Sequence, residues 1–417
     1  MTSWSMSRRI LFRFVCCYFV LYCLPGDGRV HILSTVPGDE WIGKPWTWLV
    51  HAVCPWFAIH VFHLSGQRTT YFPTGSGDTT LAWIENLLFI VAALLGTAIW
   101  SVLDRKRFEY RTAHAWLRLL LRYTLAFTLF SYGFVKVVPL QFQPPRFSRL
   151  VEPYGEFSPM GVLWSFMGSS LAYVVFSGCA EVLGGLLLLF RRTTTLGALV
   201  SFAVLANVVA LNFCYDVPVK LYSTNLLMMA VTLLAPDLRR LFDFLVLNRA
   251  TEPADPMPVT IRPRKLRIAA RVFGVLLAGW ALWFEVHQAY RSYLQVYAHP
   301  KHPPAYGLFD VETFRRAGED RPGAVRKVWF IDQGIGIRNS DDRVETYAGK
   351  YNEAKRSIAM NNGKGELTWW LPDDSHVQIE GKLDGTPVFA RLRRIDTGKM
   401  LLNGRGFHWI NEFPFNR

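Results

Sequence analysis

Charged side chains inside long apolar runs are the residues of this sequence that are best placed to do chemistry. Lys136 and Glu181 lie in two separate runs of this kind. Removing a charge from water is costly unless the charge finds a counter-charge, a hydrogen bond or water. A Lys136–Glu181 ion pair is therefore a hypothesis. It has two interpretations, a clamp between two helices or a site for proton or quinone chemistry.

A second group of polar residues occupies a tight turn between two further apolar runs. Pro218 suits the first turn of a helix, and Asp216 stands just before it as a candidate cap. The alternative is a pocket at the outer face of the membrane, in which inward-facing polar groups bind a quinone ring or similar head group. The residues of this pocket would be Asn212, Tyr215, Asp216, Lys220 and Asn225.

Histidines and a cysteine recur at a spacing of three residues near residues 51–63. The pairs are His51 with Cys54 and His60 with His63. This spacing places both members on one face of a helix, and imidazole and thiolate both bind zinc or copper. We favour histidines at the membrane interface over a metal site. A disulfide between Cys54 and Cys214 is a further alternative, because both are predicted near the outer face.

The composition places these residues in a membrane protein. Hydrophobic residues make up 51% of the 417 residues and charged residues only 19%, against about one quarter in average soluble domains. The long apolar runs lie in residues 1–290. The net charge of +14 arises in this part, because lysine and arginine gather in cytoplasmic loops. Nucleic-acid binding is therefore not expected, and the lipid bilayer is the expected partner.

About seven runs approach the length of about 20 residues that crosses a bilayer. They are 9–24, 81–103, 117–139, 169–190, 194–213, 219–235 and 269–290. If successive runs cross the membrane in alternating directions, the basic residues concentrate on one side of it, at Arg8, at 105–107, at 191–192 and at 262–271. That side is expected to be cytoplasmic. We therefore predict a bacterial inner (plasma) membrane protein with a cytoplasmic N-terminus.

Two outer segments and a tail complete the predicted organisation. The aromatic-rich loop around 41–64 predicts one or two helices on the outer surface, and the proline-rich segment 140–161 predicts irregular, partly re-entrant backbone. The domains predicted are 1–114 with the N-terminal helices, 115–240 as a membrane core, 241–298 with a flexible linker at 251–264, and 299–417 as an extracytoplasmic domain, with His299 at its boundary.

The sequence of residues 299–417 predicts an antiparallel β domain. Alternating runs and the turn dipeptides Asn362-Gly363 and Asp384-Gly385 predict hairpins. The predicted strands are 325–332, 344–347, 366–371, 376–383, 388–395 and 400–403, with one or two more expected. We predict a small lipocalin-like β-barrel, with a sandwich as the alternative. Such a barrel either holds one small apolar ligand or is filled by side chains.

The residues 132–136 (Tyr-Gly-Phe-Val-Lys) and 178–185 (Gly-Cys-Ala-Glu-Val-Leu-Gly-Gly) resemble the DoxX-like family of integral membrane proteins. The resemblance covers about residues 115–240 and implies a four-helix core, with Lys136 and Glu181 at the family's polar positions. It also implies an association with quinone and redox chemistry. The N-terminal helices and the C-terminal domain depart from the short family pattern.

Two functions remain open at this stage. The first is a redox-associated or quinone-associated subunit that partners a membrane oxidoreductase complex. The second is a non-enzymatic protein that binds a lipid, ligand or protein partner through its C-terminal barrel. Whether the protein is an enzyme is left undecided by the sequence.

Overall fold

The computed structural model describes residues 4–409 apart from 27, 28, 30, 256–258, 260, 299, 301, 364 and 407. Part of the predicted linker (256–258 and 260) and the boundary residue His299 lie outside the described residues. The chain divides into two compact units. A helical unit contains residues 1–141 and 172–293, and a second unit contains residues 142–171 and 294–417.

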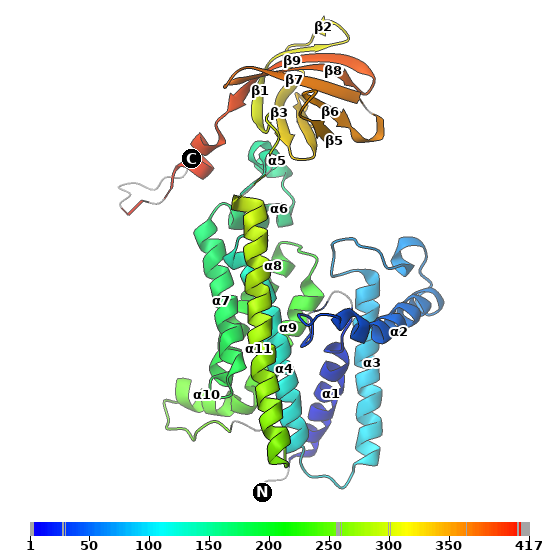
Figure 1. Cartoon of the computed structure of the whole chain (residues 1–417). Helices are drawn as coiled ribbons and strands as arrows, with labels where there is room; N and C mark the ends of the chain where they lie inside the picture. Colours follow the sequence, from blue (N-terminus) through cyan, green and yellow to red (C-terminus); the bar gives the residue numbers. More distant parts are fainter. Residues whose placement is uncertain are drawn as a thin grey trace. The chain divides into compact units, whose positions relative to one another are not determined.

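The helical unit is a bundle of long helices with shorter pieces at its ends (Figure 1). Its elements are α1 (Met6–Tyr22), α2 (Asp39–His60), η1 (Gly66–Thr69), α3 (Thr80–Leu103), α4 (Arg111–Val137), α7 (Leu171–Leu189), α8 (Thr194–Cys214), α9 (Lys220–Leu234), η3 (Ala235–Asp237), α10 (Leu238–Leu245) and α11 (Arg264–Tyr293). Every predicted span coincides with one of these helices to within a few residues.

Five helical segments among the described residues are long and apolar enough to cross a membrane. They are Thr80–Leu103, Leu171–Leu189, Thr194–Cys214, Lys220–Leu245 and Arg264–Ala298. The two other predicted spans, α1 and α4, are helices outside this set. The reason is physical: α1 has only 17 residues, and α4 carries Arg118, Arg122 and Lys136 among its apolar residues.

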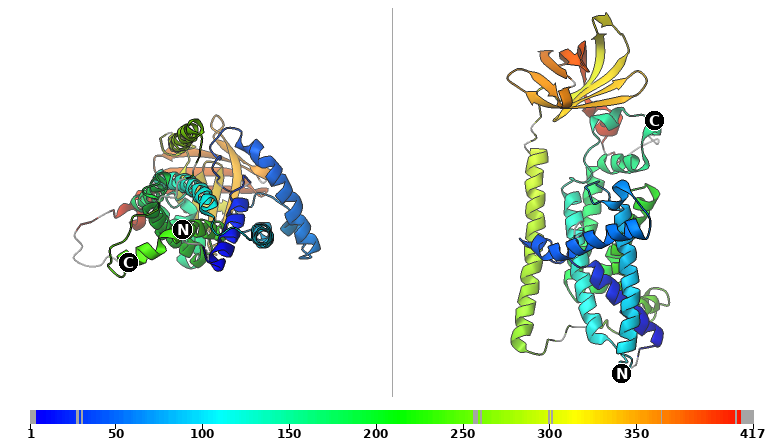
Figure 2. Two further views of the ribbon diagram at one scale, coloured as in Figure 1. Left: turned by 90° about the horizontal axis from the view of Figure 1, so that it is seen from below. Right: turned by 90° about the vertical axis from the view of Figure 1, so that its right-hand side faces the viewer.

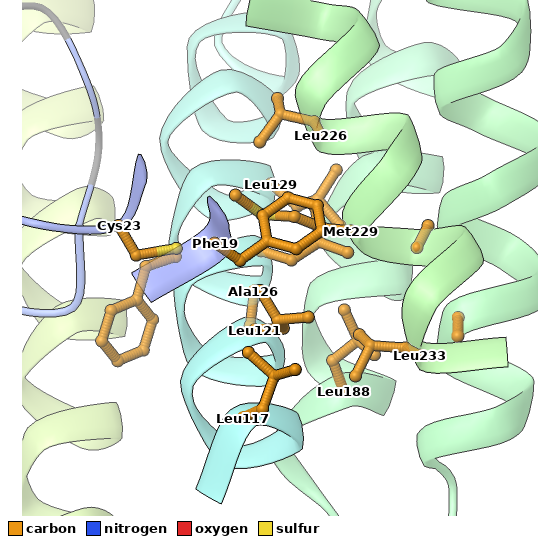
Figure 3. Packing of buried hydrophobic residues seen from close by; sticks show 14 of the residues in the cluster. Phe19, Cys23, Leu117, Leu121, Ala126, Leu129, Leu188, Leu226, Met229 and Leu233 are labelled. Atoms are coloured by element: carbon orange, nitrogen blue, oxygen red, sulfur yellow. The ribbon is translucent and has the colours of Figure 1, made fainter. Parts of the chain in front are cut away.

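The core of the bundle is built around α4. Leu121, Leu125 and Phe130 of this helix are fully buried and belong to one apolar cluster. Figure 3 shows Leu121 beside Leu188 of α7, with Met229 and Leu233 of α9 in the same cluster. By contrast, only 17% of the most apolar stretches of α3 and α11 is buried. Apolar side chains on these helices therefore face outward, as expected of surfaces solvated by lipid.

A helix that carries many exposed aromatic residues lies across the bundle rather than along it (Figure 2). This is α2, on which Trp41 is 67% and Trp48 is 73% exposed. Tryptophan is enriched where a membrane meets water. The aromatic-rich loop was thus correctly predicted to contain a helix.

The second unit contains a closed antiparallel β-barrel. The strands are β1 (Gly307–Arg316), β2 (Glu319–Asp320), β3 (Val325–Ile331), β4 (Gly334–Asn339), β5 (Val344–Asn352), β6 (Ser357–Met360), β7 (Gly365–Asp373), β8 (His376–Leu383) and β9 (Thr386–Ile395). Of these nine strands, β2 pairs only with β1, and the other eight run in sequence order until β9 pairs with β1. This is an up-and-down barrel, so the predicted barrel is confirmed.

The turns of the barrel agree with the prediction better than its strands do. Asp384 (φ 49°) and Gly385 (φ 74°) form the tight turn between β8 and β9, as a two-residue hairpin requires. The prediction of a strand at 400–403 was wrong, because these residues enter a short helix, α12 (Leu401–Gly404). The strands β1, β2, β4 and β6 were missed, because charged or glycine residues interrupt the alternation of β1 and β4, and β2 and β6 have only two and four residues.

Short elements that precede α7 belong to the same unit as the barrel. They are α5 (Phe147–Val151), η2 (Tyr154–Glu156) and α6 (Pro159–Gly168), and the π-helical turn η4 (Leu294–Ala298) leads into β1. The ring of Phe147 lies 5.1 Å from the ring of Tyr306. The predicted irregular outer segment is therefore partly helical and contacts the C-terminal domain.

Candidate ligand-binding site in the helical unit

The structure joins Lys136 of α4 to Glu181 of α7. The Lys136 Nζ lies 2.8 Å from Oε2 and 2.9 Å from Oε1 of Glu181, and it also donates to the backbone oxygen of Tyr132 at 3.2 Å. Both residues are buried, with 6% and 3% of their surface exposed. Each charge therefore has the partner that its burial demands.

Glycines allow this ion pair to form by bringing the two helices together. A Cβ atom added to Gly178 would lie 2.6 Å from the Gly133 oxygen and 2.8 Å from the Lys136 Cβ. One added to Gly133 would lie 2.7 Å from Val182. Small residues that permit such close approach are typical of helix contacts in membranes. The surroundings of Lys136 and Glu181 are thus tightly packed, which is the arrangement of a clamp rather than of an open site.

A second buried cation of α4 stabilises the end of α7. Arg122 donates hydrogen bonds to the backbone oxygens of Leu188 and Leu189, both at 3.0 Å. The last carbonyl groups of a helix lack partners within the helix, and a buried guanidinium supplies them here. Sequence reasoning missed this role, because the carbonyl partners become visible only when α4 and α7 are placed side by side.

The polar turn at 212–225 does not form the single pocket that we predicted. Asn212 donates to the Ser223 hydroxyl at 3.0 Å, whereas Asn225 bonds Tyr18 and Asn86 of other helices. The side chain of Asp216 is 82% exposed and pairs with the Lys220 ammonium at 2.7 Å. Tyr215 is half-buried. Asp216 and Lys220 pair with each other, whereas Asn212 and Asn225 bond to other residues, so these contacts do not gather the five side chains around one pocket.

The proposed capping role of Asp216 was also wrong. The residue that caps α9 is Asp78, whose two carboxylate oxygens accept hydrogen bonds from the backbone N–H groups of Lys220 (2.8 Å) and Leu221 (3.0 Å). A residue in the segment before α3 thus satisfies the free donors of a distant helix. No local spacing could have indicated this.

His51 and His60 of α2 have other partners than a metal, and His63 lies beyond the end of this helix, with a φ of 53°. The His51 ring stacks on Tyr71 with 3.9 Å between centroids, and the His60 ring nitrogen lies 2.9 Å from the Trp56 oxygen. Burial raises the pKa of the Cys54 thiol to about 11, so this thiol is protonated at neutral pH. Within the described part of the chain, no group of three or more metal-ligating residues is present.

Cys54 and Cys214 are both free thiols, so the alternative of a disulfide between them is not formed. Their environments differ, because Cys54 is buried and Cys214 is exposed. Cys54 packs in a small cluster with Ala58 of α2 and with Leu81 and Ile84 of α3. It therefore acts as a small apolar residue that attaches α2 to the bundle.

The site that sequence reasoning missed is a cavity of about 580 Å³, which we call the Arg29 cavity. Its walls come from the segment after α1, from α2, from the loop at 71–77, from α3 and from α9. Five aromatic side chains line the cavity together with small and polar residues, and they are Tyr22, Trp46, Tyr71, Phe72 and Tyr222. A cleft of this size lined by aromatic rings and a few polar groups is typical of small-molecule sites.

An ion pair supplies the polar part of the Arg29 cavity. An Nη atom of Arg29 lies 2.6 Å from Oε1 of Glu85, and the two side chains are only 13% and 16% exposed. The guanidinium also lies over the rings of Tyr22 (5.0 Å) and Phe89 (5.2 Å). Arg29 is thereby held in place by a carboxylate and two aromatic faces.

Two hydrogen-bond donors of this cavity wall are unsatisfied. The Nε of Arg29 and the Nε1 of Trp46 are buried and have no acceptor among the described residues. The two side chains approach each other at Gly26, where an added Cβ would lie 3.2 Å from both. A buried donor without a partner costs about 1–3 kcal/mol. Both atoms are covered by protein, so the cavity wall must shift before an oxygen atom of a ligand reaches them.

Fold and site together define an α-helical membrane protein with an appended β-barrel and an aromatic cavity in its helical unit. The chain belongs to the same family as an uncharacterized protein, YwoB, of Bacillus subtilis (strain 168). The two are 36% identical over 128 residues, which is 28% of this chain and 75% of the relative. No protein-family model matches the sequence, and no solved structure matches it.

Proposed function

We propose that the protein is a redox-associated membrane protein that binds the head group of a quinone in the Arg29 cavity. The observation that carries the proposal is the combination of aromatic walls, a buried Arg29–Glu85 pair and two unsatisfied N–H donors in one cavity. A quinone ring is planar and apolar and presents carbonyl oxygens at its rim. Aromatic faces match the ring, and the Arg29 and Trp46 N–H groups match the oxygens.

The Lys136–Glu181 pair has a different part in this proposal. It clamps α4 to α7 within a DoxX-like four-helix core made of α4, α7, α8 and α9. Neither residue lines the Arg29 cavity, so the pair supports the bundle and does not contact the ligand. Partnership with a membrane oxidoreductase complex follows as part of the same proposal, since a bound quinone needs an electron donor or acceptor.

The proposed location is the bacterial inner membrane, with the N-terminus in the cytoplasm and the barrel outside it. Two observations support this orientation. The connections at 104–111 and 190–193 are rich in arginine and lysine, as cytoplasmic connections are. The segment 142–171, which leaves the opposite end of α4, belongs to one unit with the barrel.

The second candidate function assigns ligand binding to the barrel. The interior of the barrel contains fully buried aromatic and aliphatic side chains, among them Phe309, Phe330, Ile335 and Ile358. An eight-stranded barrel has an interior just wide enough for side chains to fill it. We therefore favour a filled barrel, whose outer surface is the part that would meet a protein partner.

Quinone titration of the purified full chain tests the proposal. Trp46 lines the cavity, so binding of a tail-less quinone is expected to quench tryptophan fluorescence. Arg29→Gln removes the donor and the charge that holds Glu85, and we expect it to weaken binding at least tenfold. Arg68→Gln is the matched control, because Arg68 is exposed in the same outer segment. Equal binding by wild type and Arg29→Gln would refute the proposal.

A further inference from the structure

We infer that the ligand of the Arg29 cavity is a quinone with a long apolar tail, and that the tail lies in a separate groove of the helical unit. This inference rests on the proposed function. The groove, which we call the Tyr18 groove, has a volume of about 360 Å³. Its walls come from α1, α3, α8 and α9 and include Phe14, Tyr18, Ile90, Phe213, Thr224 and Met228.

The two spaces meet at residues that they share. Asn86 of α3 and Leu221 of α9 line both the Arg29 cavity and the Tyr18 groove. The boundary between the two is a small polar cluster, in which the Tyr18 hydroxyl lies 2.7 Å from Oδ1 of Asn86 and 2.5 Å from Oδ1 of Asn225. A molecule held in the cavity therefore has the start of the groove next to it.

The chemical character of the two spaces is different. The Arg29 cavity contains a charged pair and unsatisfied donors, whereas the Tyr18 groove is lined mainly by aromatic and aliphatic side chains. A polar region followed by an apolar one matches an amphipathic molecule with a polar ring and a hydrocarbon chain. A small polar ligand could fill the Arg29 cavity but would leave the Tyr18 groove empty.

The groove opens toward the surface that lipid is expected to cover. Three of its lining side chains are strongly exposed: Trp83 (50%), Phe213 (56%) and Met228 (47%). They belong to α3, to α8 and to the helical segment Lys220–Leu245, which begins with α9, and these segments are long and apolar enough to cross a membrane. A tail in the groove thus reaches the hydrocarbon region, where the isoprenoid chain of a membrane quinone is dissolved. The geometry therefore favours the isoprenoid tail of a membrane quinone as the occupant of the Tyr18 groove.

Blocking the groove while leaving the cavity intact tests the inference. Ile90→Trp replaces an aliphatic side chain with a bulkier indole ring in the groove, and Met228→Trp does the same from α9. Leu94→Trp is the matched control, because Leu94 is 56% exposed one turn further along α3 and does not line the groove. Affinity is measured in nanodiscs for two quinones that have the same ring, one without a tail and one with an isoprenoid tail. Each dissociation constant is expressed relative to the concentration of the quinone in the lipid.

We expect Ile90→Trp and Met228→Trp to weaken binding of the tailed quinone at least fivefold and to change binding of the tail-less quinone less than twofold. Leu94→Trp should change neither. If both quinones respond alike to the groove variants, the tail does not occupy the groove and the inference is wrong, although the proposed function stands. If neither quinone binds the wild-type protein, the proposed function itself is refuted.

Discussion

The carboxylate of Asp78 accepts a hydrogen bond from the backbone N–H of Lys220 at 2.8 Å, although 142 residues separate the two. The other oxygen of Asp78 accepts from Leu221, and the Lys220 ammonium lies 3.9 Å from the same carboxylate. The segment before α3 is thereby fastened to the start of α9. Because Gly77 and Leu221 line the Arg29 cavity, this link also shapes the candidate site.

Asp78→Ala should destabilise the helical unit by about 1–2 kcal/mol, the usual cost of removing a helix cap. Asp216→Ala is the control, because its side chain is 82% exposed and does not cap α9; its effect should be within about 0.5 kcal/mol. Thermal unfolding of the detergent-solubilised protein measures both. Equal destabilisation by the two variants would show that the Asp78 cap is unimportant.

Lys136→Met should be strongly destabilising, since it leaves the buried Glu181 carboxylate without a counter-charge. The expected loss is about 3–5 kcal/mol. The double variant Lys136→Met with Glu181→Leu should regain most of that stability, because neither charge then remains buried. Quinone affinity of the folded double variant should match that of wild type, as neither residue lines the cavity. Loss of binding in a stable double variant would instead place the pair in the site.

Gly178→Ala should separate α4 from α7. The added methyl group would meet backbone atoms of Gly133 and Val137 at 2.6 and 2.7 Å, and backbone cannot move aside as a flexible side chain can. Overpacking of this kind costs about 1–3 kcal/mol. The control is Gly279→Ala in α11, where no atom lies within 4 Å of the added Cβ. That variant should be neutral or slightly stabilising, because alanine favours helix. The unfolding temperatures decide the comparison.

The helical unit should lose stability in mildly acidic solution through His31. Burial lowers the pKa of this imidazole, and this effect outweighs the attraction of Asp39. The backbone N–H of Leu33 also donates to its Nδ1 at 3.2 Å. The folded state therefore binds fewer protons than the unfolded state at and below the ordinary histidine pKa of about 6.5. It follows that stability falls as the pH falls through this range.

His31→Asn checks this pH dependence, because asparagine keeps an acceptor for the Leu33 N–H but does not titrate. Unfolding temperatures measured between pH 7.5 and pH 5.5 should decline more steeply for wild type than for His31→Asn. Parallel curves for the two proteins would assign the acid sensitivity to other groups.

The elements of this protein were largely predictable from its sequence. Apolar runs form helices in the bilayer because the backbone must satisfy its own hydrogen bonds there, so the runs at 81–103 and 194–213 became α3 and α8. The alternation at 376–383 and the Asp384-Gly385 turn likewise determined β8 and its hairpin with β9. Burial of opposite charges in neighbouring runs also predicted the contact of Lys136 with Glu181.

What only the tertiary structure decided is where distant segments meet. The Arg29–Glu85 pair joins a loop to α3 across 56 residues, and the Asp78 cap joins the segment before α3 to α9. Neither contact has a local spacing or periodicity that would reveal it, because side-chain partners in a bundle depend on which helix faces are adjacent. The candidate site therefore lies where the sequence showed only a polar loop, an aromatic helix and an ordinary glutamate.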